Sequence, residues 1–342
     1  MRLPFCPRKV PDRADAGATL AVDGCPFDFA PPAMSAERSD RAALVMLALG
    51  ASLISTTGIL VRYADVPPTV SGFWRMAFGG GILVLALVLL RQWRPTTPAI
   101  WWWMLLPAAA MAIDLALWHR SILTTGPGLA TLLSNFQVFF MALAGFILYR
   151  ERLGPRFLAG LLLAFLGTWL LVGMDWAMFA PAYRTGIILG ILSGLAYAVY
   201  LLSFRHAQQR GASAIPAAQL LAINSLLCAA FLGLAALIEQ APLAIPDNRS
   251  LLALVSLGIV GQCLGWVLIT RAMPRLPAST VGLLLLLQPT LAFVLDVLLF
   301  QRQTSALEWL GLALALGGIF IGTIRLAHRR TPLPHGEEGD PQ

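Results

Sequence analysis

Charged side chains are scarce in this chain of 342 residues, since Asp, Glu, Lys and Arg together make up only 12% of it. Apolar residues make up 58%, and the mean hydropathy is +0.75. The surface of a water-soluble globular domain needs far more charge than this. The composition therefore excludes such a protein and predicts an integral membrane protein.

Metal-binding and catalytic motifs are also missing. The four cysteines, Cys6, Cys25, Cys228 and Cys263, show neither a disulfide framework nor zinc-ligand spacing. The four histidines form no HExxH motif, and the chain has no P-loop and no plausible Ser/His/Asp set. We therefore expect no enzyme activity, no metal and no cofactor. Without a nucleotide motif, any transport must be driven by a gradient or by exchange of solutes.

What the sequence does contain is a series of long apolar runs, each of the length that an α-helix needs to cross a hydrocarbon core of about 30 Å. The runs lack the alternation of strands, and helices satisfy their own backbone hydrogen bonds in lipid. We predict an all-α integral membrane protein with ten transmembrane helices. Their expected ranges are 42–61, 71–90, 100–121, 128–148, 155–173, 185–204, 216–238, 251–271, 277–299 and 307–324.

The two ends of the chain differ from these runs. Residues 1–38 are rich in Pro, Asp, Arg and Ala without periodicity, and residues 325–342 are charged and contain Pro, so both are predicted to be disordered tails. Met34 is a plausible translation start, which suggests that residues 1–33 are an upstream extension. N-terminal sequencing of the native protein tests this, and recovery of residues 1–33 would reject it.

Basic residues favour one orientation. With ten helices and the N-terminus inside, 18 of the 24 Lys and Arg residues fall on the inner side. Because basic residues concentrate in cytoplasmic loops, both termini are expected in the cytoplasm, with the protein spanning the inner (plasma) membrane several times. The net charge of +7 is then topological, and we expect the lipid bilayer, not nucleic acid, as its surroundings.

The chain also repeats itself at a shift of 151 residues. Five helices form each half, and because five is odd, the halves must be inverted in the membrane. The predicted domains are residues 42–173 and 185–324. Inverted repeats are typical of secondary transporters, whose substrate site lies where the halves meet. The matched positions are Leu117/Leu268, Arg120/Arg271, Gln137/Gln288, Leu148/Leu299, Gly160/Gly311, Ala164/Ala315 and Gly167/Gly318.

Further motifs accompany the repeat: Arg75, Leu115 to Leu117, Gly126 to Ala130, Leu148 to Leu153, Gly160 to Gly167, Pro277 to Ser279, Leu287 to Pro289 and Gly311 to Gly318. With these motifs, the chain resembles the drug/metabolite transporter superfamily, and specifically its EamA-type ten-helix exporters. The resemblance implies export of amino acids or related metabolites. Two positions depart from the repeat pattern: Arg302 stands where the first half has Glu151, and Pro289 where it has Val138.

Three ionisable residues lie within the predicted helices, where charge is expensive and therefore often functional. Arg75 either holds a substrate carboxylate or extends to the membrane interface. Asp114 is deeper, and it pairs with Arg75, binds a substrate amine, carries a proton or makes a structural hydrogen bond. Asp296 is near a helix end, where we expect it to be hydrated.

Polar residues beside indoles occur on two helices related by the repeat. Asp114 precedes Trp118 by four residues, and Gln262 precedes Trp266 by four, so each pair shares a helix face. Such pairs suit an organic solute with a flat or apolar part. Since Trp118 is followed by His119 and Arg120, it is also a candidate interface residue, and we favour Trp266.

Two matched glutamines, Gln137 and Gln288, either line a cavity or join neighbouring helices. Pro289 predicts a kink next to Gln288. Weaker lining candidates are Asn135, Tyr197, Tyr200 and Asn224. The glycines predicted to make close helix contacts are Gly79, Gly80, Gly81, Gly160, Gly167, Gly311, Gly317 and Gly318.

The sequence thus predicts a secondary transporter that moves a small-molecule solute by alternating access. The substrate-binding candidates are Arg75, Asp114, Trp118, Gln137, Gln262, Trp266 and Gln288. A membrane-embedded enzyme or an accessory membrane protein on a transporter scaffold is the alternative, and a dry, tightly packed centre would favour it. Proton coupling, and the choice between monomer and homodimer, stay open.

Overall fold

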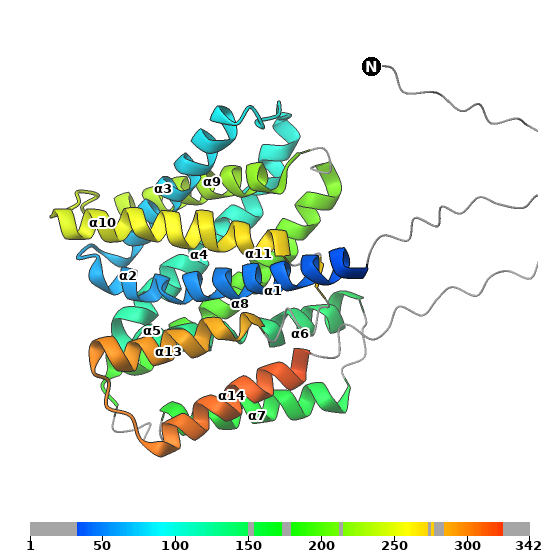
Figure 1. The fold of residues 1–342 in the computed structure, drawn as a ribbon. Helices are drawn as coiled ribbons and strands as arrows, with labels where there is room; N and C mark the ends of the chain where they lie inside the picture. The colour runs from blue at the N-terminus through cyan, green and yellow to red at the C-terminus, as the bar shows by residue number, and fades with distance from the viewer. Residues whose placement is uncertain are drawn as a thin grey trace, which may run out of the picture.

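A computed structural model describes residues 33–149, 154–172, 179–211, 215–272, 275–276 and 284–323, and the regular secondary structure in these ranges is helical throughout (Figure 1). Most of both predicted tails, Glu151 and the segment Pro277 to Ser279 lie outside the described residues. Helix α1 (Ala33–Ser55) begins six residues inside the predicted N-terminal tail. Ala, Met, Glu and Arg in this stretch are strong helix formers, which accounts for the earlier start.

Each of the ten predicted helices has a counterpart in the described residues, which form an all-helical membrane protein with two repeats. Seven helices are long and apolar enough to cross a membrane, and three shorter apolar helices are present as well. Besides α1, the described helices are α2 (Thr57–Tyr63), α3 (Pro68–Leu89), α4 (Pro98–Thr125), α5 (Pro127–Ser134), α6 (Gln137–Tyr149), α7 (Pro155–Val172), α8 (Pro181–Gly211), α9 (Ala217–Ile238), α10 (Asn248–Ser256), the π-helix η2 (Leu257–Gly265), α11 (Trp266–Ala272), α13 (Leu287–Phe300) and α14 (Ala306–Thr323).

The packing of the helices has the two-fold pattern expected of inverted repeats. Helix α4 packs along α8, and its counterpart is the packing of α1 on η2 and α11. Likewise, α4 packs on α9 and η2 packs on α3. Three further pairs, α3 with α9, α5 with α13, and α7 with α14, each join equivalent helices of the two halves. The centre of the bundle therefore lies between the repeats.

Several spans are interrupted near the middle. Helices α5 and α6 are separated by a turn at Asn135 and Phe136, and an equivalent turn at Leu286 precedes α13. The two turns are 151 residues apart, at matched positions of the repeat. Their causes differ. Pro289 removes a helical N–H in the second half, whereas in the first half the side-chain amide of Asn135 donates to the carbonyl of Thr131 at 2.8 Å.

Helices α7 and α14 form a pair at the edge of the bundle (Figure 1). A Cβ added to Gly160 would lie 2.6 Å from the carbonyl oxygen of Gly318, and one added to Gly311 would lie 2.7 Å from that of Gly167. The repeated glycines thus let the two backbones approach closely, as predicted. Gly79 and Gly80 in α3 also make close helix contacts, since an added Cβ would lie 2.6 Å from the Cβ of Gln262 and 3.1 Å from the Cβ of Ser225.

The prediction was wrong for Gly81 and Gly317. A Cβ at Gly81 would meet nothing within 4 Å, and one at Gly317 would lie 4.0 Å from its nearest neighbour, in Leu163. Both glycines share a run with glycines that do make contacts, but each points away from the helix that those residues touch. Helix rotation, which runs of glycine do not specify, decides which of the neighbours faces inward.

Candidate functional site

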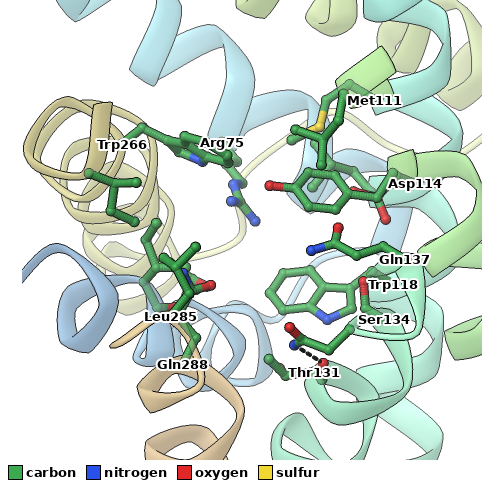
Figure 2. A pocket seen from close by; sticks show the side chains of 17 residues that line it. Arg75, Met111, Asp114, Trp118, Thr131, Ser134, Gln137, Trp266, Leu285 and Gln288 are labelled. Atoms are coloured by element: carbon green, nitrogen blue, oxygen red, sulfur yellow. Dashed lines mark hydrogen bonds between the residues drawn. The ribbon is translucent and has the colours of Figure 1, made fainter. Parts of the chain in front are cut away.

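A cavity of about 210 Å³ lies between the two repeats. Figure 2 shows Trp266, Leu285 and Gln288 of the second repeat on one side and Asp114, Trp118 and Gln137 of the first repeat on the other, with Arg75 extending between them. The cavity is lined by Ile54, Thr57, Arg75, Met111, Asp114, Leu115, Trp118, Thr131, Ser134, Asn135, Gln137, Tyr197, Leu201, Trp266, Ile269, Leu285 and Gln288.

Six of the seven substrate-binding candidates line this cavity, and Gln262 does not. Its side chain is buried between α3 and α9: the amide nitrogen donates to the hydroxyl of Ser225 at 2.9 Å, and its Cβ lies 2.6 Å from where a Cβ of Gly79 would be. Gln262 belongs to η2, whose wider turn changes the face on which residues four apart fall. The spacing argument that joined Gln262 to Trp266 assumed an α-helix and fails for this reason.

Arg75 does not reach the membrane interface, so that alternative was wrong. The side chain extends from α3 into the bundle and is only 4% exposed. Its Nε and Nη1 atoms have no hydrogen-bond partner among the described residues, and its guanidinium lies 5.5 Å from the centre of the Trp118 ring. An arginine at the centre of a membrane-spanning helix costs about 2.5–3.5 kcal/mol even on insertion scales, so an unpartnered one is unusual.

Asp114 lies on α4, on the same side of the cavity as Trp118. One carboxylate oxygen accepts a hydrogen bond from the Ser193 hydroxyl at 2.6 Å, and that hydroxyl also lies 3.1 Å from the Ser134 hydroxyl. No ion pair of 4.0 Å or less joins Asp114 to Arg75, both of which the structure describes. The predicted Arg75–Asp114 pair is therefore not formed, and a Ser193-centred hydrogen bond stands in its place.

Aromatic side chains supply much of the remaining wall. Trp118 is 8% exposed and belongs to the core, so its interpretation as an interface residue was wrong. Trp266 lies on the opposite side, with its ring 6.4 Å from that of Tyr197. Tyr197 in turn stacks on Tyr200 at 5.6 Å. The preference for Trp266 over Trp118 has no support in the geometry, since both indoles line the cavity.

The two matched glutamines sit immediately after the two interrupted points of the bundle. Gln137 is the first residue of α6, and Gln288 is the second residue of α13. Both line the cavity. A broken helix exposes backbone groups beside its turn, and in transporters such breaks are found where a polar ligand is held near the membrane midplane.

Sequence reasoning missed Met111, Thr131, Ser134 and the partner of Asp114, Ser193. A serine in an apolar helix gives no signal, because it bonds readily to its own backbone. Tyr197 and Asn135 were only weak candidates, yet both line the cavity, whereas Tyr200 and Asn224 do not.

Charged contacts close one end of the bundle, where α2 ends and α3 begins, and which we call the α2–α3 end. Asp296 was expected to be hydrated there, but it is only 1% exposed, so that expectation was wrong. Its carboxylate accepts from the Gly128 N–H at 3.3 Å and lies 3.7 Å from both Arg62 and Arg302. The two arginines, distant in sequence, cover Asp296 and exclude water from it.

A second charged group lies at the same end. Arg120 donates to Glu239 at 2.6 Å and to Thr69 at 2.9 Å, and Thr69 donates to Glu239 at 2.8 Å. These contacts join α4, α9 and α3. Like the Asp296 group, they connect helices from both repeats at one end of the bundle.

The comparisons with known proteins agree with this architecture. The sequence model of the EamA-like transporter family matches residues 41–173 and 184–324. The chain belongs to the EamA-like transporter family. It is therefore a multi-pass membrane protein with two EamA domains, in a family whose members are typically transporters and not enzymes.

Two curated relatives extend the match. The chain is 24% identical over 270 residues to "Uncharacterized transporter YwfM" of Bacillus subtilis, covering 78% of this chain and 88% of the relative. It is 30% identical over 287 residues to "Uncharacterized protein PA1977" of Pseudomonas aeruginosa, covering 82% and 94%. A solved structure entitled "Crystal structure of protein" has a TM-score of 0.56 and 22% identity, over 86% of this chain and 98% of that one, and shows a shared fold.

Proposed function

We propose that this EamA-family protein is a secondary transporter that exports amino acids or related small metabolites by alternating access. The observation that supports this most is the cavity between two inverted halves, which contains Arg75, Asp114, Gln137 and Gln288 and lies beside two helices interrupted at matched positions. Its volume of about 210 Å³ is below the ~300–1,000 Å³ of pockets for drug-sized ligands, which favours a metabolite-sized solute.

The charged groups at the α2–α3 end are separate from the cavity. On α4 the lining stops at Trp118, seven residues before the helix ends at Thr125. In the second repeat the lining includes Ile269, three residues before α11 ends at the opposite end. The charged groups around Asp296 and Glu239 thus lie between the cavity and the α2–α3 end. Opening at that end requires their ion pairs to separate.

With both termini in the cytoplasm of an inner (plasma) membrane, the α2–α3 end faces outward. The closed charged end is then the outer one. Release to the outside would follow when the two halves rock and the ion pairs break. The export direction rests on the family resemblance. The alternative of an enzyme or accessory protein on this scaffold would suit a dry, tightly packed centre, and a cavity that contains Arg75, Asp114 and two glutamines argues against it.

Flux measurements on purified protein test the proposal. Proteoliposomes loaded with single amino acids and related metabolites should release at least one solute faster than protein-free liposomes, with or without an imposed proton gradient. Vesicles of known orientation give the direction. Folded protein that moves no solute of a broad panel, under any gradient or in exchange, would reject the transporter proposal.

A further inference from the structure

Arg75 lies at the cavity without an ion-pair partner among the described residues. The residue is only 4% exposed, and two of its three guanidinium nitrogens have no hydrogen-bond partner among the described residues. Figure 2 shows the guanidinium extending into the cavity. Arginine cannot lose its charge in proteins, so this cation persists at any physiological pH.

None of the described acidic side chains near the bundle centre and its closed end forms an ion pair with Arg75. Asp114 accepts from Ser193 at 2.6 Å and lies beyond 4.0 Å from Arg75. Asp296 lies between Arg62 and Arg302, Glu239 pairs with Arg120, and Glu308 pairs with Arg302. These four carboxylates therefore leave Arg75 without a counter-ion within ion-pair distance.

The surroundings of the guanidinium leave room for a ligand and hold the side chain in place. Trp118 lies over one part of it at 5.5 Å, and a Cβ on Gly261 of η2 would lie 3.7 Å from Nη2. The aromatic ring favours the cation, and the guanidinium borders the cavity that can hold a ligand. Arginine presents a planar fork of N–H donors that matches a carboxylate with two parallel hydrogen bonds.

We propose that the transported solute is an organic carboxylate whose anionic group binds Arg75 and whose apolar part lies against Trp118, Tyr197 and Trp266. This rests on the proposed transport function and specifies its substrate class. The cavity selects for the negative group: a carboxylate is required, and an amine is neither required nor sufficient. A zwitterion binds through its carboxylate, whereas a cation of the same shape lacks the group that Arg75 binds.

Three probes of nearly equal shape separate these classes: 3-phenylpropionate, 3-phenylpropan-1-ol and 3-phenylpropylamine. Binding is measured on detergent-purified protein through thermal stabilisation as a function of probe concentration. Acetate and hexanoate extend the carboxylate series to smaller and more flexible solutes. We expect at least one carboxylate to stabilise the wild-type protein in a saturable way, and the alcohol and amine to do so at least tenfold more weakly.

Variants locate the binding. Charge-assisted hydrogen bonds contribute about 1.5–3 kcal/mol each, so Arg75→Gln should weaken carboxylate binding about 10- to 100-fold. Arg75→Lys keeps the charge without the fork and should be intermediate. Arg205→Gln, at an exposed position of α8, is the control and should bind as the wild type does.

The outcomes are distinct. Three results would each overturn the inference: the amine or alcohol stabilises the protein as strongly as the carboxylate does, carboxylate binding is unchanged in Arg75→Gln, or no carboxylate binds. The comparison of the three probes uses the wild-type protein, so it is valid even if Arg75→Gln does not fold. Flux of neutral or cationic solutes that survives in Arg75→Lys would leave the transporter proposal intact while rejecting the substrate class. Carboxylate binding that depends on Arg75, without flux of any solute, would support the carboxylate site and reject the transporter proposal.

Discussion

Two buried carboxylates in the same bundle, Asp114 and Asp296, have opposite surroundings. Asp296 is compensated by two arginines and a backbone N–H at the closed α2–α3 end. Asp114 has a single serine hydroxyl and faces a cavity that also holds an unpartnered arginine. A charge with its full set of partners stabilises the fold. One with an incomplete set, beside open space, is available to a ligand or a proton.

The largest expected effect tests the compensated carboxylate. Asp296→Ala leaves Arg62 and Arg302 without their shared partner and should lower the free energy of unfolding by about 2–3 kcal/mol. The value lies below that for a fully buried pair, because Arg62 is 42% exposed and Arg302 17% exposed. Thermal unfolding in detergent measures it, with the exposed Asp65→Ala as control. Equal stability of the two variants would contradict the role given to Asp296.

A smaller loss is expected at one of its partners. Arg302→Gln removes one of the two arginines beside Asp296 together with the contact to Glu308, but Arg62 remains. The free energy of unfolding should fall by about 1–2 kcal/mol, which is less than for Asp296→Ala. The same unfolding assay checks this, and a loss greater than that of Asp296→Ala would show that Arg302 acts mainly through other contacts.

The smallest effect on stability is expected at the cavity. Ser193→Ala removes the hydrogen bond to Asp114 and should cost about 1 kcal/mol of stability, because the carboxylate still borders a cavity wide enough for water. The pH dependence of transport should also shift, since the hydroxyl favours the charged carboxylate. An unchanged pH profile would separate Ser193 from the transport site.

The sequence predicted the architecture well, because the thickness of the bilayer sets the length of the apolar runs and the 151-residue repeat is visible in the residues themselves. It also indicated Arg75 and Asp114, since a charge in an apolar helix is visible without a structure. The sequence did not predict which residues form ion pairs and hydrogen bonds with one another. Asp296 seemed hydrated because Arg62, 234 positions earlier in the chain, gives no sign that it will lie 3.7 Å away.

Helix rotation and local geometry set the other limit. The π-helical turns of η2 moved Gln262 from the cavity to the α3–α9 contact, and no periodicity argument based on 3.6 residues per turn would detect this. Trp118 was placed at the interface because His119 and Arg120 follow it, but the helix continues to Thr125 and carries Trp118 into the core. Interrupted helices were anticipated at Pro289, whereas the matching turn at Asn135 depended on a side-chain hydrogen bond.

The most direct test of the central claim, that the cavity and not the closed end binds the solute, compares Asp114→Asn with Asp296→Asn in one experiment. The concentration of the transported solute that gives half-maximal flux is measured at several pH values, alongside thermal stability. We predict that Asp114→Asn shifts that concentration or abolishes its pH dependence at near wild-type stability, whereas Asp296→Asn lowers stability and leaves the concentration unchanged. Wild-type transport at every pH in Asp114→Asn would contradict the account.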